Sequence, residues 1–238
     1  MPKTKKTSAA SSPPALIKPG LFGLTVPADA RRAEFDMFNE ALLANHVKPY
    51  AVFIGDSITG QWDLQAYFGP GNVLVNRGMA GDSSEYVLRR FDADVVQLAP
   101  ELAVICVGVN DTGWGVGTPD PAKVDVVLDN IQTMADKAAA GGIAVAIGSN
   151  FPLRSPIWYN LPEFAAAKNR LTVKINKGLQ GIARRDGHIY VDYHRHVVDA
   201  KGLMDKNLAY DGIHPNHNGY TIMRDVLNNT LAKAGFTL

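Results

Sequence analysis

Three side chains that could together perform nucleophilic catalysis stand far apart in the sequence. Ser57 follows Gly55 and Asp56, whereas Asp211 precedes His214 by three residues in the segment DGIHP. A serine hydroxyl is a weak nucleophile until a base removes its proton. An aspartate at that spacing can fold back onto the imidazole and fix its tautomer, which leaves the other ring nitrogen free to accept a serine proton. These residue types predict acyl transfer through an activated serine.

Two further residues could stabilise the charge that acyl transfer builds on the carbonyl oxygen. Gly78, in the segment NRGMAG at residues 76–81, can offer a backbone N–H without a side chain that blocks approach. Asn110, in GVND at residues 108–111, can offer a side-chain amide. Preorganised N–H donors of this kind form oxyanion holes. Taken singly, each also fits a plainer interpretation, a turn glycine and a turn-capping asparagine.

The catalytic candidates have plainer interpretations as well. Ser57 could be the N-cap of a helix, as serines after strands often are. Asp211 and His214 could form a hydrogen bond in a surface loop, and two metal ligands without an obvious third make a weak metal site. Asp56 is expected to support the loop, because His214 already supplies the base.

The elements that must position these residues alternate along the chain from residue 29. Short, continuous apolar runs alternate with segments of helical periodicity, such as 84–98 and 218–234, and this alternation is typical of a parallel sheet covered on both faces. Ligands of such sheets bind beyond the carboxyl ends of the strands, where the segments 55–57, 76–78 and 108–110 fall. The expected strands are Tyr50–Ile54, Val73–Val75, Leu102–Val107, Ile143–Ile147 and His188–Val191.

Together the four polar segments resemble the sequence blocks of the SGNH hydrolases, also called GDSL esterases and lipases. The blocks occur in order between about Tyr50 and Ala234: GDSI in place of GDSL at Ser57, a glycine at Gly78, GxND at Asn110, and DxxHP at His214. The resemblance implies a flavodoxin-like three-layer α/β/α fold with a five-stranded parallel sheet. No Gly-x-Ser-x-Gly elbow is present, which disfavours the larger α/β-hydrolase fold.

The resemblance also implies roles for individual residues. Ser57 would be the nucleophile, His214 the base and Asp211 its orienting partner. The backbone amides of Ser57 and Gly78 and the side chain of Asn110 would form the oxyanion hole. The implied activity is hydrolysis of a small-molecule carboxylic ester through an acyl-enzyme, with no cofactor and no metal.

Substrate selectivity is expected to come from loops beside these blocks. Trp114 follows Asn110 between two glycines, and Phe151 and Arg154 follow the fourth expected strand. Aromatic rings can face an acyl chain or a sugar ring, and an arginine can meet an anionic group. The alternative is that the rings cover the edge of the core. Trp62 is expected to pack against the helix that follows Ser57.

Composition limits the classes of protein. The chain has 238 residues, with 24 Lys and Arg against 23 Asp and Glu. This near-neutral balance argues against nucleic acid as a partner. Cys106 is the only cysteine, which excludes an internal disulfide, and no apolar run approaches the length of a membrane span. The composition leaves open whether the chain forms a homo-oligomer.

The first twenty residues differ in composition from the rest. They contain four lysines, four prolines and no acidic or aromatic residue, so residues 1–20 are expected to form a flexible tail and residues 21–238 a single domain. Proline and serine interrupt the apolar stretch that a signal peptide needs, which makes the cytoplasm the default location.

Three other functions fit parts of the pattern. A carbohydrate O-acetylesterase would use the same four blocks on a different alcohol. A catalytically silent ligand-binding module would have no chemical need for Ser57, Asp211, His214 and Asn110 together. A nucleotide-binding flavodoxin-like protein would need a phosphate-cradling loop, and neither Gly-x-Gly-x-x-Gly after the first strand nor a P-loop lysine occurs.

Overall fold

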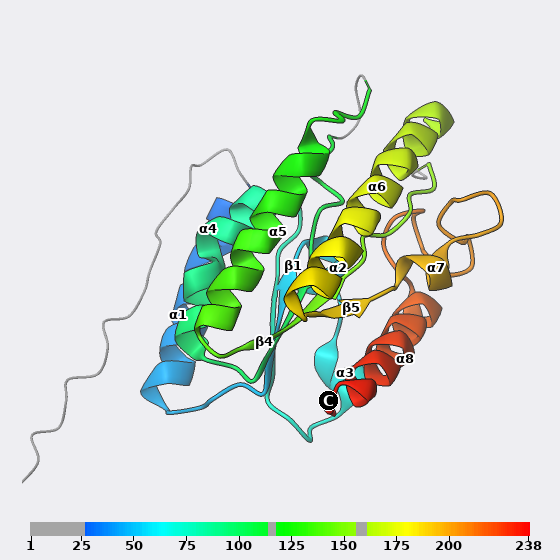
Figure 1. The fold of residues 1–238 in the computed structure, drawn as a ribbon. Helices are drawn as coiled ribbons and strands as arrows, with labels where there is room; N and C mark the ends of the chain where they lie inside the picture. The colour runs from blue at the N-terminus through cyan, green and yellow to red at the C-terminus, as the bar shows by residue number, and fades with distance from the viewer. Residues whose placement is uncertain (1–26, 114–117, 156–160) are drawn as a thin grey trace, which may run out of the picture.

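A five-stranded parallel sheet forms the centre of the protein (Figure 1). A computed structural model describes residues 27–113, 118–155 and 161–238. The strand order is β2-β1-β3-β4-β5, the flavodoxin-like order, in which the chain reverses direction of winding between β1 and β3. The predicted three-layer α/β/α class with five parallel strands is confirmed. The strands are β1 (Ala51–Gly55), β2 (Leu74–Gly78), β3 (Leu102–Cys106), β4 (Ala144–Gly148) and β5 (Ile189–Val191).

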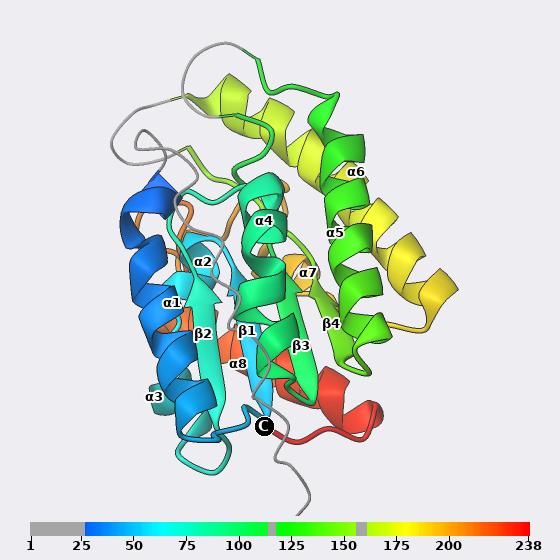
Figure 2. The ribbon, with the colours of Figure 1, turned by 90° about the vertical axis from the view of Figure 1, so that its left-hand side faces the viewer.

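Helices cover both faces of the sheet, which explains why the central strands are apolar on both sides. Figures 1 and 2 show α4, α5 and α6 on one face, with α1 beside α4, and α3, α7 and α8 on the other. On the first side lie α1 (Pro27–Ala44), α4 (Ser84–Asp94), α5 (Lys123–Ala140) and α6 (Pro162–Asp186). On the second lie α2 (Ser57–Gly60), α3 (Leu64–Phe68), α7 (His194–Val197) and α8 (His217–Lys233).

The two layers have separate apolar cores. Alternate residues of β1 point to opposite faces, so Ile54 packs in the core under α4, α5 and α6 while Phe53 packs in the core under α8. In the second core Trp62 is only 3% exposed, meets Phe53 edge to face and stacks on Tyr220. Burying one such large apolar side chain stabilises the fold by about 1.5–3 kcal/mol. Trp62 therefore belongs to this core, beside the short helix α2 that carries Ser57.

The carboxyl ends of β1, β2 and β3 are in register, at the end of the sheet where the site lies. Gly55, the last residue of β1, pairs with Gly78 at the end of β2 and with Cys106 at the end of β3. The loops that follow these three strands therefore start side by side. This register brings three of the four sequence blocks to one edge of the sheet.

Element boundaries differ from the predictions by at most four residues. The segment predicted as one helix over 84–98 ends as α4 at Asp94 and continues as a 3₁₀ turn, Val96–Leu98. Val95 between them has φ −128° and ψ −62°, outside the helical range, which breaks the α-helix. The expected tail at residues 1–20 lies outside the described residues, and the division into tail and domain stays a prediction.

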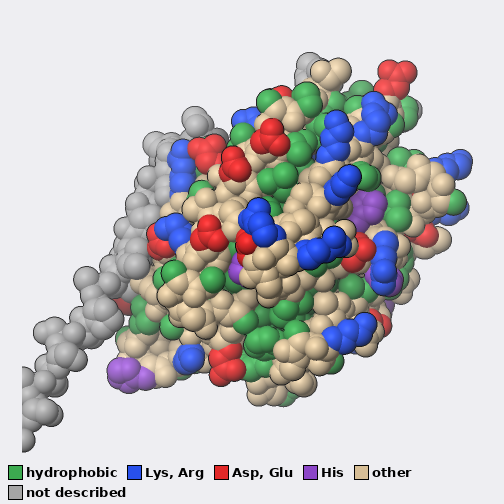
Figure 3. Space-filling model, in the orientation of Figure 1, with side chains coloured by type: hydrophobic (Ala, Val, Ile, Leu, Met, Phe, Trp, Pro, Cys, Tyr) green, Lys and Arg blue, Asp and Glu red, His purple; other side chains and the backbone are tan. Residues whose placement is uncertain are grey.

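Charges on the surface are mixed. The face in Figure 3 shows Lys and Arg interspersed with Asp and Glu over α5 and α6. Among the residues described, no helix is both long and apolar enough to cross a membrane.

Candidate active site

Ser57 lies at the junction of β1 and α2. Asp56 caps α2, and its Oδ1 accepts a hydrogen bond from the Ile58 N–H at 2.9 Å. Ser57 is thus the first residue of the helix, and its interpretation as the N-cap is wrong because Asp56 occupies that position. The Ser57 side chain is held at a helix N-terminus, where backbone N–H groups lack partners within the helix. Asp56 supports the loop, as predicted.

Asp211 and His214 form a closed turn before α8. Asp211 Oδ1 accepts hydrogen bonds from the backbone N–H groups of Ile213 and His214, both at 2.8 Å. Its other oxygen, Oδ2, lies 2.6 Å from His214 Nδ1. Gly212 has φ +92°, and a Cβ there would lie 2.8 Å from the Arg154 carbonyl oxygen. A glycine is required at this position both by conformation and by space.

The structure brings these residues to Ser57 across 157 positions of sequence. Ser57 Oγ lies 2.9 Å from His214 Nε2. Because the Asp211 carboxylate can only accept a hydrogen bond, Nδ1 carries the ring proton and Nε2 is left as the acceptor for the serine hydroxyl. The Asp211 side chain is 3% exposed and that of His214 is 17% exposed. A hydrogen bond in a surface loop is therefore not the correct description of this pair.

Asn110 lies in the loop after β3, next to the turn after β2. Its Nδ2 donates to the Asp82 carbonyl oxygen at 2.8 Å. Asp111 binds the N-terminus of α4, because its carboxylate accepts from the Ser84 N–H at 3.0 Å and from the Ser84 hydroxyl at 2.5 Å. The GVND segment thus fastens the β3 loop to the β2 loop.

The amide of Gly78 is already engaged, contrary to the role predicted for it. The Gly78 N–H donates to Asn76 Oδ1 at 2.8 Å. A Cβ on Gly78 would lie 2.1 Å from the Gly60 nitrogen, so this glycine permits close packing of β2 against α2. Its close packing and its hydrogen bond explain the residue without an oxyanion.

Gly81, three residues further along, has the properties that Gly78 lacks. It is exposed, has φ +84°, and adjoins Asp82, whose carbonyl accepts from Asn110. Within the described ranges its N–H donates no hydrogen bond. Sequence reasoning missed Gly81 because the NRGMAG segment contains both glycines, and only the three-dimensional structure shows which amide is open.

The structure gives different results for the three residues predicted to bind substrate. Phe151 is 2% exposed and stacks on Tyr193 at a centroid distance of 5.7 Å, so it belongs to the core. Arg154 is also not placed as predicted, because its guanidinium donates to Asp199 Oδ2 at 2.5 Å and to the Met204 carbonyl at 2.8 Å. Trp114 lies outside the described residues.

A buried arginine that the sequence pattern did not reveal binds the strand ends beneath the site. Arg90 of α4 is fully buried and donates to the carbonyl oxygens of Gly55 and Arg77, which belong to the ends of β1 and β2. It also forms ion pairs with Asp82 and Asp94, both at distances below 3 Å. Since a buried guanidinium needs its donors satisfied, this arrangement fixes the strand ends relative to α4.

Burial changes the pKa values of several ionisable groups near Ser57. It raises the pKa of Asp56 to about 7, against the opposing effect of the hydrogen bond from Ile58. It raises the pKa of Asp82 to about 6, although Arg90 acts in the other direction. Burial also raises the pKa of the Cys106 thiol, which keeps this buried residue in its unreactive thiol form.

Comparison with known proteins agrees with this geometry. The sequence model of the GDSL-like Lipase/Acylhydrolase family matches residues 53–222, well over half of the chain. The chain therefore belongs to the GDSL-like lipase/acylhydrolase family, and it is a hydrolase of ester bonds. No match was found among curated proteins.

Solved structures show the same fold. A GDSL-like lipase from Bacteroides thetaiotaomicron is 28% identical, with a TM-score of 0.72 over 85% of this chain and 97% of that chain. A catalytic mutant of Axe2, an acetylxylan esterase from Geobacillus stearothermophilus, is 19% identical, with a TM-score of 0.60 over 77% of this chain and 94% of that chain. At that identity the second likeness concerns the fold alone.

Proposed function

We propose that the protein hydrolyses small carboxylic esters through an acyl-enzyme formed on Ser57. The observation that carries the proposal is the continuous chain of hydrogen bonds from Asp211 through His214 to Ser57, with distances of 2.6 Å and 2.9 Å. Such a chain supplies a nucleophile, its base and the group that orients the base.

In the first step His214 Nε2 takes the proton of Ser57 as Oγ attacks the ester carbonyl carbon. The imidazolium that results faces the Asp211 carboxylate, which stabilises the positive charge. Asp211 holds its orientation during this step because its other oxygen is bound by two backbone N–H groups. The π electrons of the carbonyl move onto its oxygen and form the tetrahedral oxyanion.

We assign the oxyanion to the Ser57 N–H, the Gly81 N–H and the Asn110 side-chain amide. Gly81 replaces Gly78 in this assignment, because the Gly78 amide is bound to Asn76. The hydrogen bond from Asn110 to the Asp82 carbonyl holds its amide beside the Gly81 turn. Fixed donors of this type are effective because they need no reorganisation as charge develops.

The intermediate then collapses, the bond to the leaving alcohol breaks, and His214 Nε2–H protonates that alcohol. A water molecule next attacks the acyl-enzyme while His214 accepts its proton. Breakdown of the second intermediate returns the proton to Ser57 and releases the carboxylic acid. The steps consume one ester and one water and produce one alcohol and one acid.

A carbohydrate O-acetylesterase is the second candidate, favoured by one observation. The Tyr210 ring stacks on His214 with a centroid distance of 5.7 Å and an interplanar angle of 16°. It is 56% exposed, and its hydroxyl donates to Gln61 Oε1 at 3.0 Å. Because His214 must protonate the leaving alcohol, that alcohol lies beside Tyr210. An exposed ring with a polar tip suits the face of a sugar.

Labelling with a fluorophosphonate probe, followed by intact-mass measurement, tests the proposed function. The wild-type protein is expected to gain one adduct, on Ser57, with loss of fluoride. Ser57→Ala is expected to abolish the adduct, and His214→Ala is expected to slow its formation greatly. A folded wild-type protein that neither labels nor hydrolyses any ester would overturn the proposal and favour the silent binding module.

A substrate panel separates the two candidates. Acetylated methyl glycosides are compared with alkyl and p-nitrophenyl esters of increasing acyl length. For a sugar ester, Tyr210→Ala is expected to raise KM about three- to tenfold, which matches ~0.5–1.5 kcal/mol for an aromatic contact. Tyr210→Phe, which keeps the ring, is the matched control. An equal effect of Tyr210→Ala on a small alkyl acetate would contradict a sugar-binding role.

A further inference from the structure

One buried charge near the site has no part in the proton transfers. Lys168 of α6 is 1% exposed, and its Nζ donates to the Gly113 carbonyl oxygen at 2.7 Å. The Nζ also lies 5.8 Å from the centre of the Phe164 ring. Lysine is rarely buried to this degree without a specific partner. Its buried neighbours on α6 are apolar, such as Leu171 and Ile175, or polar and uncharged, such as Thr172, so none of them is a counter-charge for an ammonium group.

The carbonyl that Lys168 holds belongs to the loop of Asn110. Gly113 lies three residues after Asn110, and its own N–H donates to the Asn110 carbonyl at 3.3 Å. Lys168 therefore fastens the far end of a short turn, while Asn110 Nδ2 fastens the near end to Asp82. A displacement of Gly113 would shift Asn110 through this turn.

The surroundings of Lys168 contain two carboxylates from separate loops. Burial lowers the pKa of Lys168 to about 7, and the charges of Asp111 and Asp56 act in the opposite direction. Asp111 belongs to the Asn110 loop and binds Ser84 of α4, whereas Asp56 directly precedes Ser57. The ammonium of Lys168 thus lies in the field of two of the three loops that supply candidate oxyanion donors.

We propose that Lys168 is a positioning residue of the oxyanion hole, which holds the 110–113 turn so that the Asn110 amide faces the developing charge. This inference rests on the proposed function, because it assigns Lys168 an effect that passes through Asn110. Lys168 itself does not contact the reacting atoms.

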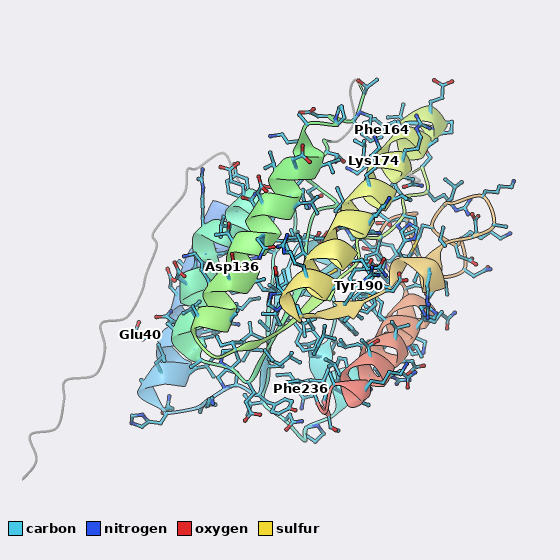
Figure 4. All side chains as sticks on the ribbon, viewed as in Figure 1. Glu40, Asp136, Phe164, Lys174, Tyr190 and Phe236 are labelled. Atoms are coloured by element: carbon cyan, nitrogen blue, oxygen red, sulfur yellow. The ribbon has the colours of Figure 1, made fainter. Side chains whose placement is uncertain are left out.

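The first experiment compares Lys168→Met with Lys174→Met. Methionine fills similar volume without burying a charge, so the Lys168 variant is expected to fold. Lys174 is an exposed lysine of the same helix (Figure 4), and its variant is the matched control. Lys168→Met is expected to lower kcat about tenfold or more with little change in KM, because small displacements of catalytic groups cost rate. Lys174→Met is expected to leave both constants unchanged.

A double-mutant cycle distinguishes positioning from a general structural effect. If Lys168 acts through Asn110, Lys168→Met is expected to reduce kcat by less than about twofold in an Asn110→Ala background. Lys168→Arg, which keeps the charge and the donors, is expected to recover part of the loss. This arginine variant also tests the proposal if Lys168→Met is found to be unfolded.

The outcomes separate failure of this inference from failure of the proposed function. An equal loss of kcat with and without Asn110, or a folded Lys168→Met protein with wild-type kcat, would overturn the role of Lys168 alone. Ester turnover that is independent of Ser57 would overturn the proposed function. A tenfold loss confined to the background that retains Asn110 would establish the positioning role.

Discussion

Replacement of Asp211 by asparagine is expected to leave the turn intact but to stop His214 from acting as the base. Asp211 Oδ1 accepts two backbone N–H groups at 2.8 Å, and these donors require an acceptor. The asparagine oxygen must therefore take that side, which turns its NH₂ group toward His214 Nδ1. Nδ1 then becomes an acceptor and Nε2 carries the proton, 2.9 Å from Ser57 Oγ. In this tautomer the imidazole cannot accept the serine proton.

The magnitude follows from that change of tautomer. The same substitution in the Ser-His-Asp triad of a serine protease lowers kcat about 10⁴-fold, and a similar loss is expected for Asp211→Asn. That loss corresponds to ~5.4 kcal/mol of transition-state stabilisation, at 1.36 kcal/mol for each factor of ten. The free energy of unfolding is expected to fall by much less than this loss of transition-state stabilisation, because both backbone hydrogen bonds to Oδ1 remain. Asp211→Ala is the variant for comparison. It also leaves those two N–H groups without their acceptor, which is expected to lower the free energy of unfolding by ~1–3 kcal/mol for each group.

The assay is hydrolysis of p-nitrophenyl acetate together with chemical denaturation of each variant. The ¹⁵N chemical shifts of His214 report the tautomer directly, with Nδ1 protonated in wild type and Nε2 protonated in Asp211→Asn. A folded Asp211→Asn protein within about tenfold of wild-type turnover would refute the reasoning. A His214 tautomer in Asp211→Asn that is unchanged from wild type would also refute the reasoning, whatever the kinetics show.

Three further predictions concern Asn110, Arg154 and Asp56. Asn110→Ala is expected to lower kcat about 10²–10³-fold, the cost of one oxyanion donor, while KM changes little. Arg154→Gln is expected to lower the unfolding free energy by about 1–3 kcal/mol without raising KM, because the guanidinium is bound to Asp199. Asp56→Asn is expected to remove a pH dependence of stability, as chemical denaturation between pH 4 and pH 8 would show. The folded pKa of about 7 exceeds the unfolded value of 3.8, so stability falls as pH rises between these values.

Each of these predictions has a defined contrary result. Wild-type turnover in Asn110→Ala would remove this residue from the oxyanion hole. A raised KM for an anionic ester in Arg154→Gln, at unchanged stability, would restore the substrate-binding role first expected of Arg154. For Asp56→Asn, the asparagine oxygen can still accept from Ile58, so the cap serves as its own control. A pH dependence of stability as steep as that of wild type would show that Asp56 is ionised over this range.

Local spacing was sufficient for the parts of the site that lie within one turn. The Asp211 and His214 side chains meet because the two residues are three positions apart and Gly212 accommodates the turn. Continuous apolar runs likewise predicted five parallel strands, since a strand buried on both faces cannot alternate with polar residues. The polar segments at or just beyond the carboxyl ends of β1, β2 and β3 then had to fall at one end of the sheet.

Spacing could not show which groups would be occupied by neighbours from elsewhere in the chain. Arg154 is bound by Asp199, a residue 45 positions away. Phe151 was expected at a substrate and lies in the core against Tyr193. Each outcome depends on how separate loops and helices pack, which the local pattern does not contain.

The sequence by itself therefore determined the α/β alternation, the edge of the sheet that carries the site, and the pairing of Asp211 with His214. Only the tertiary structure decided that this pair reaches Ser57, that Gly81 has the open amide, and that Lys168 holds the Asn110 loop. The physical reason is the range of the interactions. Periodicity and short turns are properties of neighbouring residues, whereas the partners of a buried polar group are selected by the folded chain as a whole.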